Sequence, residues 1–383
     1  MNLSLNIPFN RPLMIGGEPE AIQEAVHSGM LAGNGSFTSY CEGLLSKLVG
    51  ALDVLLTPSC THALEMAALL IDIGPGDEVI MPSWTFVSTA NAFVLRGAIP
   101  VFVDISTADG NLDVTLIEAA ITPRTRAIVP VHYGGVACDM DAIMLIAERH
   151  ALWVIEDAAQ AVMSNYKNRH LGSIGHLGAF SFHATKNYTS GGEGGALVVN
   201  DASFLDRARI LREKGTNREA FASGAVNQYQ WLDIGSSFLM SELQAAFLSV
   251  QLDAAQAVKF ERRARWENYA SELAPLSDFH GIKQASVPDW ADHNGHIFFL
   301  KARDLRARNE LLAGLNAKGV CAQAHYVPLH LSPAGKQFGR NVGACSKTVE
   351  LYERLVRLPV FHSLTDGEQA YVIDSVEACL RGC

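Results

Sequence analysis

Between residues 50 and 200, short apolar runs alternate with helical patterns, and this alternation strongly limits the folds open to the chain. The runs include "VLLTPS", "DEVIMPS", "PVFVDI", "AIVPVHY" and "LWVIEDAA", and the segments between them include "HALEMAALLIDI" and "DAIMLIAERH". Strands that are apolar along their whole length are typical of a parallel sheet with helices on both faces. The pattern predicts an α/β fold that binds its ligands at the carboxyl ends of the strands.

The chain changes character after about residue 200. Its 383 residues suit roughly two domains. Long helical patterns, among them one continuous pattern over residues 240–273, are followed by a smaller mixture of strand and helix patterns. We predict a large domain over residues 1–250 and a smaller C-terminal α+β domain over residues 251–383, joined by a long helix.

Composition excludes several classes of function. The net charge of -10 argues against broad affinity for nucleic acid or anionic membrane, and no apolar run approaches the ~20 residues that span a bilayer. The seven cysteines are scattered, with no spacing typical of a zinc site. We expect free thiols, no metal, no membrane segment, no targeting signal and a cytoplasmic protein. The cysteines are Cys41, Cys60, Cys138, Cys321, Cys345, Cys379 and Cys383.

Two strand ends carry residues that suit an anionic, ring-shaped ligand. Asp157 ends the strand "LWVIED", where a carboxylate at the edge of the core needs a cationic partner or caps the next helix. The turn "TPSCTHALEM" leads from a strand into a helix, and the Cys60 and Thr61 amides with the Thr61 hydroxyl could bind a phosphate there or serve as a plain helix start. Neither motif decides the matter alone.

Lys186 gives these residues a common interpretation. It lies in "SFHATKNYTSGGEGG", a loop between two further strand patterns. Trp84 follows another strand, where its ring could cover a flat ligand or belong to the core. Pyridoxal 5'-phosphate requires an amine for its aldehyde, a carboxylate for its ring nitrogen, N–H groups for its phosphate and an aromatic face for its ring. We interpret the four features together as a site for this cofactor.

Several long motifs then show a family resemblance. They include "GPGDEVIMPSWTFVSTANAF", "AITPRTRAIVPVHYGG", "EDAAQA", "GSIGHLGAFSFHATKN" and "GEGGALVVND", in the same order as in the DegT-type sugar-nucleotide aminotransferases. The chain resembles this family from "IPFNRP" almost to its C-terminus. The resemblance implies fold type I of the pyridoxal-phosphate enzymes, with a mostly parallel seven-stranded sheet flanked by helices and a smaller C-terminal α+β domain.

The resemblance also implies roles for individual residues. Lys186 would be the Schiff-base lysine and Asp157 the partner of the pyridine nitrogen. Trp84 would lie over the ring and Gln160 beside its phenolic oxygen. The phosphate would bind Thr61, Ser181 and the Cys60 amide. In many members an asparagine of a second subunit reaches the phosphate; Ser237 holds that position here. A homodimer with shared active sites is therefore expected. The sequence does not decide whether Ser237 makes the contact with the phosphate of the second subunit.

The amino-acid sequences of the motifs resemble those of transaminases that make dTDP-4-amino-4,6-dideoxy-D-galactose for bacterial cell-surface polysaccharides. This similarity implies dTDP-4-keto-6-deoxy-D-glucose as acceptor and L-glutamate as donor. Basic residues for these anions could come from Arg212, Lys214 and Arg218, which could equally be an ordinary helix end, and from His325 and His330. Two alternatives remain: an aminotransferase that acts on another nucleotide keto sugar, and a cofactor-binding regulator that catalyses no reaction. The presence of Lys186 and Asp157 argues against the regulator.

Overall fold

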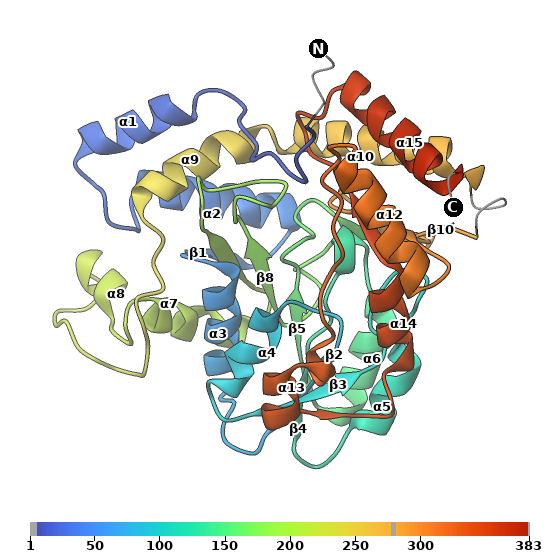
Figure 1. Ribbon diagram of the computed structural model, residues 1–383. Coiled ribbons are helices and arrows are strands. Elements are labelled where there is room, and N and C mark those ends of the chain that lie inside the picture. Colours follow the sequence, from blue (N-terminus) through green and yellow to red (C-terminus); the bar gives the residue numbers. More distant parts are fainter. Residues whose placement is uncertain (1–5, 277–280, 382–383) are drawn as a thin grey trace.

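A large twisted sheet forms the centre of the molecule (Figure 1). The computed structural model describes residues 6–276 and 281–381; the first five residues, where no targeting signal is expected, and Cys383 lie outside them. Within the described residues this sheet has eight strands, which run in the spatial order β1-β9-β8-β5-β4-β2-β3-β13. In that order the strands are Asp53–Thr57, Gly195–Val199, Leu177–Ser181, Trp153–Asp157, Thr125–Ile128, Glu78–Pro82, Ile99–Val103 and Arg340–Asn341.

The sheet is mostly parallel, as predicted. Only β9 runs against its neighbours β1 and β8, and the other described pairs in the sheet are parallel. Seven of the strands coincide with the seven predicted apolar runs. The eighth, β13, is a two-residue edge strand from the C-terminal part of the chain, and its length is too short for a periodic pattern to reveal.

Helices cover both faces of this sheet. One layer contains α3 (Cys60–Leu70), α4 (Val87–Val94) and α7 (Leu205–Arg212), and its buried side chains form one apolar cluster with the sheet. The opposite layer contains α2 (Ser36–Val49), α5 (Ile117–Ala120), α6 (Met140–His150) and α9 (Glu242–Asp253). This arrangement explains why the strands are apolar along their whole length.

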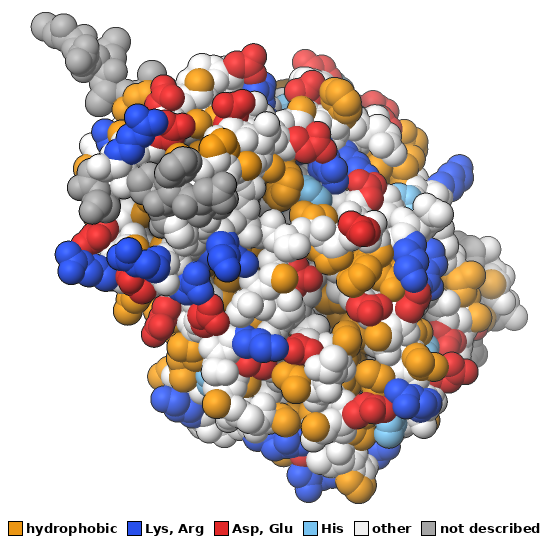
Figure 2. Space-filling model, turned by 90° about the vertical axis from the view of Figure 1, so that its right-hand side faces the viewer, with side chains coloured by type: hydrophobic (Ala, Val, Ile, Leu, Met, Phe, Trp, Pro, Cys, Tyr) orange, Lys and Arg blue, Asp and Glu red, His pale blue; other side chains and the backbone are white. Residues whose placement is uncertain are grey.

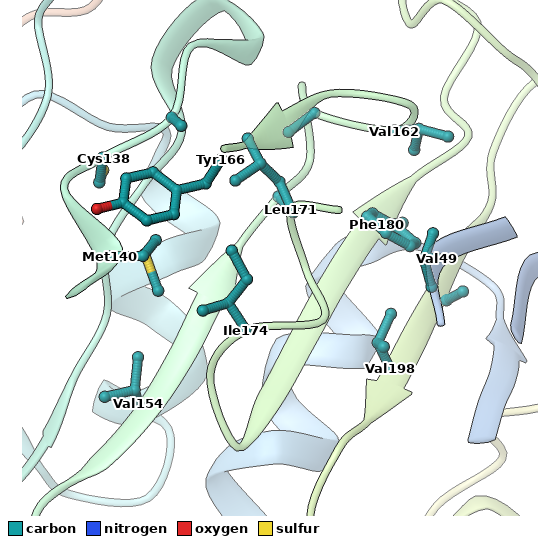
Figure 3. Close-up of a cluster of buried hydrophobic side chains, with 14 of the residues drawn as sticks. Val49, Cys138, Met140, Val154, Val162, Tyr166, Leu171, Ile174, Phe180 and Val198 are labelled. Atoms are coloured by element: carbon teal, nitrogen blue, oxygen red, sulfur yellow. The ribbon is translucent and has the colours of Figure 1, made fainter. Parts of the chain in front are cut away.

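The apolar cluster between the sheet and the layer of α2, α5, α6 and α9 extends into a loop and a β-hairpin. Figure 3 shows Tyr166 and Leu171 from this region packing near Met140 and Ile174. The hairpin consists of β6 (Asn165–Tyr166) and β7 (Arg169–His170), and β11 (Ala291–Asp292) pairs with β6. The packing holds the chain that follows Asp157 against the sheet.

The C-terminal part has its own small sheet and core. Strands β10 (Lys283–Gln284), β12 (Phe298–Lys301) and β14 (Leu355–Leu358) are antiparallel. Their apolar side chains pack with the helices around them. These helices are α10 (Ala255–Leu273), α12 (Leu305–Ala317), α14 (Ser346–Arg354) and α15 (Asp366–Arg381). The predicted α+β character of this part is therefore present.

The long helix predicted over residues 240–273 is instead two helices. Ala254 leaves the helical conformation, with φ -92° and ψ 8°, between α9 and α10. The apolar pattern does not reveal the break, because alanine and the residues around it favour helix on both sides. Arg340 in β13 also pairs with Glu78 of β2 at 2.6 Å, across the predicted boundary at residue 250. That boundary stays a prediction.

The described residues also form helices outside the layers named above. They are α1 (Glu18–Ser28), α8 (Arg218–Ala222), α13 (Pro333–Phe338) and the 3-10 helices η1 (Val114–Leu116), η2 (Tyr133–Gly135), η3 (Ala202–Phe204) and η4 (Leu329–Leu331). Helix α8 and the loop after it project from the body of the molecule (Figure 1). Acidic and basic side chains are interspersed over the face seen in Figure 2.

Two further findings concern the described residues as a whole. Cys41, Cys60, Cys138, Cys321 and Cys345 are free thiols. No helix in the described ranges combines the length and apolar character needed to cross a membrane.

Candidate active site

A cavity of about 400 Å³ opens at the carboxyl ends of the strands, where an α/β sheet of this kind binds ligands. Residues at or just beyond the ends of β1, β2, β4, β5 and β8 form much of its wall. The cavity brings together six residues predicted for the cofactor and one predicted for the substrate. They are Cys60, Thr61, Asp157, Gln160, Ser181, Lys186 and His325.

The first turn of α3 forms one wall. Ser59 is the N-cap, and its hydroxyl accepts a hydrogen bond from the His62 amide at 3.2 Å. The amides of Cys60 and Thr61 follow, at a position where a helix has no carbonyl of its own for them and where its dipole favours an anion. The hydroxyls of Thr61 and Ser88 lie 2.8 Å apart and both line the cavity. This wall fits a phosphate group.

A glycine allows the sheet to approach this turn closely. A Cβ at Gly195, in β9, would lie 2.3 Å from the Cys60 nitrogen and 2.3 Å from the Ser59 carbonyl carbon. No side chain fits in that space. Gly195 therefore lets β9 pack directly against the start of α3. The backbone of β9 supports the wall that fits a phosphate group.

Asp157 lies at the end of β5 and is 6% exposed. Its Oδ2 accepts a hydrogen bond from the Thr89 hydroxyl at 2.6 Å, and its Oδ1 accepts one from the Ala159 amide at 3.2 Å. The Thr85 and Thr89 hydroxyls lie 2.7 Å apart, which extends this chain of hydroxyls. No ion pair to Asp157 is present among the described residues, and no helix begins directly after it. The carboxylate is thus available to a cationic ligand atom in the cavity.

Lys186 lies in a turn that the neighbouring chain holds in place. Its amide donates to the His183 carbonyl at 2.9 Å, and Asn10 from the N-terminal segment donates to the Ala184 carbonyl at 3.3 Å. Burial lowers the pKa of the Lys186 ammonium, Arg357 lowers it further, and Cys60 and Asp157 oppose this shift. A lowered pKa makes the neutral, nucleophilic amine easier to reach.

Beyond Asp157, the cavity wall consists of an amide side chain and aromatic rings that are joined by hydrogen bonds. Gln160 accepts from the Gly134 amide at 2.7 Å and donates to the Tyr326 hydroxyl at 3.1 Å. The His325 ring lies 3.6 Å from the Tyr326 ring, and His325 Nδ1 is 2.6 Å from the Tyr133 hydroxyl. Burial lowers the pKa of His325 well below its usual range, so this ring is neutral.

The comparison with known proteins agrees with this geometry. The model of the DegT/DnrJ/EryC1/StrS aminotransferase family matches residues 14–377. The chain belongs to this family. The prediction of an aminotransferase is thereby confirmed.

Relatives of this aminotransferase match over nearly their full lengths. The spore coat polysaccharide biosynthesis protein SpsC of Bacillus subtilis (strain 168) is 36% identical over 384 residues, which cover 98% of this chain and 97% of SpsC. The structure of DesV from S. venezuelae has a TM-score of 0.89 and 32% identity, with 98% of each chain covered. Spr1654 of Streptococcus pneumoniae, in its PLP form, has a TM-score of 0.90 and 27% identity, with 99% of each chain covered.

The cavity of the aminotransferase fits the predicted cofactor, pyridoxal 5'-phosphate, which also agrees with the family and with the PLP form of Spr1654. The α3 wall suits the phosphate, and Asp157 is a buried carboxylate without an ion pair in the described part of the chain. Lys186 supplies the amine. These are the separate groups that the cofactor requires.

The placement of Trp84 differs from the prediction. Trp84 is fully buried and does not line the cavity; it packs behind His325 and Tyr326, with ring centroids 6.0 and 5.8 Å away. Phe86, two residues later, lines the cavity and is 57% exposed. The chain turns after β2, so the tryptophan points into the core and the phenylalanine into the cavity. Trp84 therefore cannot cover a ligand ring directly, and Phe86 is the aromatic residue placed to do so.

The predicted basic residues of "LREKGTNR" do not reach the cavity of their own chain. Arg212 is 1% exposed and pairs with Glu42 at 2.5 Å, so it is part of the core and not a substrate residue. Lys214 and Arg218 are exposed and lie outside the cavity, as does Ser237. Whether the exposed three meet the cavity of a second subunit stays a prediction.

His330 also lies outside the cavity. It is in η4, and its Nδ1 is 2.6 Å from the Ser83 hydroxyl, which ties the loop before α13 to the end of β2. This contact occupies Nδ1 of the ring, and a role of His330 toward the substrate stays a prediction. Of the two histidines predicted in "HYVPLH", only His325 lines the cavity.

Several cavity residues were not predicted. Phe9, Asn10, Arg262 and Arg357 come from segments far from the strand ends, and His296 lies between β11 and β12. Arg262 is 3% exposed and lies in the middle of α10, where it is one of many charged residues in a helical pattern. No local signal in the sequence distinguishes it from its exposed neighbours.

Proposed function

We propose that this protein is a sugar aminotransferase that transfers the amino group of L-glutamate to dTDP-4-keto-6-deoxy-D-glucose. The product would be dTDP-4-amino-4,6-dideoxy-D-galactose, a sugar for bacterial cell-surface polysaccharides. The observation that carries the reaction class is the single cavity lined by Lys186, Asp157 and the start of α3. The motif wording supports the choice of sugar. Reaction in the cytoplasm is part of the same proposal.

Each group of the cavity has a task in this reaction. Bound pyridoxal phosphate supplies an aldehyde that takes up the amino group and a ring that withdraws electrons from the reacting carbon. Asp157 would pair with the ring nitrogen and hold a proton there. Lys186 would hold the cofactor through its amine and would move a proton at the reacting carbons.

The remaining cavity residues orient the cofactor. The Cys60 and Thr61 amides and the hydroxyls of Thr61 and Ser181 line the cavity and would hold the phosphate. Gln160, whose amide group is held by the Gly134 amide and the Tyr326 hydroxyl, would bind the ring oxygen. Phe86 would take the role over the ring that the resemblance suggested for Trp84.

The charge of the cavity supports anionic substrates. Arg262 and Arg357 both line it, and no carboxylate of the described residues pairs with either guanidinium. Arg357 donates to the Gln323 side chain at 3.3 Å and to the Ala324 carbonyl at 3.0 Å, which leaves positive charge directed to the cavity. L-Glutamate has two carboxylates and the sugar nucleotide a diphosphate, and either suits this charge.

We also propose a homodimer with shared active sites. Helix α8 and the segment after it expose six large apolar side chains on a projecting part of the molecule (Figure 1). They are Phe221 (45%), Val226 (37%), Tyr229 (54%), Trp231 (78%), Leu232 (53%) and Ile234 (44%). A patch of this kind is typical of a protein interface. Ser237, Lys214 and Arg218 lie in or next to this segment and would then face the partner's cavity.

Product analysis tests the proposal. Purified protein is mixed with pyridoxal phosphate, L-glutamate and either dTDP-4-keto-6-deoxy-D-glucose or a UDP-linked keto sugar, and the amino sugar is identified by mass and NMR. We expect a 4-amino product with galactose stereochemistry from the dTDP sugar. Product from the UDP sugar alone would favour the alternative of another nucleotide keto sugar, because a few hydrogen bonds decide such discrimination. No amino transfer to any sugar would overturn the proposal.

A further inference from the structure

His296 and Lys186 line the same cavity from different parts of the chain. His296 lies between β11 and β12, in the C-terminal part, whereas Lys186 lies in the loop between β8 and β9. The same two side chains also line a second, smaller space of about 10 Å³, enough for at most one water molecule. Both residues therefore border the large cavity and the small space, and Lys186 is close enough to His296 to interact with it electrostatically.

Asn187 decides which nitrogen of His296 carries hydrogen. Asn187 Nδ2 donates to the Asn294 carbonyl at 3.1 Å, and Asn187 Oδ1 lies 2.7 Å from His296 Nδ1. The reversed amide would set its oxygen against the Asn294 carbonyl, so Oδ1 faces the ring. An amide oxygen only accepts, and Nδ1 must therefore carry the hydrogen. In the neutral ring, Nε2 then holds a free electron pair.

The charges around His296 keep the ring neutral. Burial lowers the pKa of His296 well below its usual range, and Lys186, Arg262 and Arg357 lower it further. These cations lie in the Lys186 loop, in α10 and in β14. His325 also interacts with His296, and burial lowers its pKa as well. Tyr188 lines the small space beside His296, and burial raises the pKa of its hydroxyl, so neither group adds charge.

We propose that His296 Nε2 is the base that takes a proton from the ammonium group of the incoming amino donor. This inference rests on the proposed aminotransferase function, because an amine can attack the cofactor only through a free electron pair. One N–H bond of the donor breaks and the Nε2–H bond forms. When Lys186 is released, the proton passes from Nε2 to its nitrogen, and no electrons are exchanged. Asn187 is a positioning residue, since it acts through the ring.

The donor itself makes His296 a better base. The carboxylates of the donor bring negative charge toward Arg262 and Arg357, the same cations that hold the ring neutral in the free protein. Binding of an anionic donor therefore offsets part of the positive field at His296. Proton uptake is coupled in this way to the arrival of the substrate that provides the proton.

The state of His296 can be measured without cofactor. Protein labelled with 15N in histidine is studied by long-range 1H–15N NMR, and the His296 signals are identified by their loss in His296→Asn. We expect a neutral ring with hydrogen on Nδ1 from pH 6 to 8. In Asn187→Leu, the ring loses its fixed partner and should populate the other form. A charged ring or hydrogen on Nε2 in the unmodified protein would overturn the inference.

The base can be tested in the donor half-reaction. Asparagine at position 296 can keep a hydrogen bond to Asn187 but has no basic nitrogen in place of Nε2. We expect the loss of visible absorbance after L-glutamate addition to be about 100-fold slower in His296→Asn, the lower range for general-base catalysis. Added imidazole should restore part of the rate, which a merely structural role would not allow.

A matched control separates this effect from damage to the fold. His293 is 2% exposed, accepts a hydrogen bond from the Gly295 amide at 3.1 Å and does not line the cavity. His293→Asn should leave the half-reaction rate within about twofold. Equal rates in His296→Asn and unmodified protein would overturn the inference. If the unmodified protein itself does not react with L-glutamate or any other amino acid, the proposed function fails instead, and the NMR result still stands by itself.

Discussion

The cavity and the projecting segment around α8 differ in how their functional residues are held. In the cavity, Asp157, Gln160 and His325 each have hydrogen-bond partners that fix their orientation before any ligand arrives. In the projecting segment, Lys214, Arg218 and Ser237 are exposed and meet no cavity of their own chain. Chemistry is thus preorganised within one chain, whereas the segment acquires a role only against a second surface.

This difference separates what can be changed without losing the reaction. Substitutions of the residues that line the cavity within one chain should alter the reaction at any protein concentration, because a second subunit does not replace them. Substitutions in the segment should act through association and should depend on concentration. The predictions below test this distinction, beginning with the largest expected effect.

Lys186→Ala should abolish the reaction. The variant loses the amine proposed to bind the cofactor and to carry the proton, so we expect at least about a thousandfold slower turnover and loss of the visible absorbance of the bound cofactor. Stopped-flow spectroscopy and product assays measure both quantities. Raising the protein concentration should restore neither, and recovery at high concentration would contradict the assignment of this group to one chain.

Arg357→Gln should weaken donor binding. The guanidinium lines the cavity and has no carboxylate partner among the described residues, so its loss removes a charge-assisted hydrogen bond to the donor. We expect the half-saturating concentration of L-glutamate to rise about 10-fold or more, with little change in maximal rate. Arg303→Gln is the control, because Arg303 is 75% exposed and pairs only with the adjacent Asp304. If the half-saturating concentration of the sugar nucleotide rises instead, Arg357 binds the diphosphate and not the donor.

Trp231→Ala should weaken the proposed dimer. The ring is 78% exposed, and large aromatic residues at the centre of interfaces often contribute about 2 kcal/mol or more. We expect the dimer dissociation constant to rise about 30-fold in sedimentation equilibrium, and activity to recover at high protein concentration. Leu95→Ala, at a site that is 70% exposed away from the segment, serves as control. An unchanged dimer would remove the segment from the interface.

Lys186→Met should have a small, pH-dependent effect on the stability of the cofactor-free protein. Because folding lowers the pKa of Lys186, the charged form costs stability at any pH below that pKa. The methionine variant should therefore be more stable than the unmodified protein at pH 7. The difference should shrink as the pH rises through the ordinary pKa of lysine, about 10.4, above which both folded and unfolded lysine are neutral. Urea unfolding at pH 7 and 10 measures it, and a difference that grows with pH would contradict the sign.

The sequence predicted the sheet and the cofactor wall because both follow local rules. Asp157 ends a strand and Thr61 lies in the first turn of a helix, so an apolar run followed by a polar residue indicates their position, whereas Ser181 was implied by the family resemblance. Trp84 shows the limit of this rule. Beyond the last paired residue of β2 the alternation of faces no longer holds, and the ring that reaches the cavity is Phe86.

The rest of the cavity depends on contacts between distant parts of the chain. Arg262, His296 and Arg357 reach it only because the C-terminal part folds against the large sheet. Each lies in an ordinary helix, loop or strand pattern. The role inferred for His296 depends on Asn187, which is 109 positions away, and no periodicity connects them.

The edge strand β13 has a consequence for how this enzyme can be divided or recombined. Its two residues come from the C-terminal part, yet they pair with β3, and Arg340 holds the pKa of the buried Glu78 carboxyl at about 2. A fragment that ends at residue 250 would leave the large sheet without one edge and Glu78 without that guanidinium. Chimaeras with relatives should therefore exchange β13 and the Arg340–Glu78 pair as one module, so that no unpaired sheet edge is exposed to aggregation.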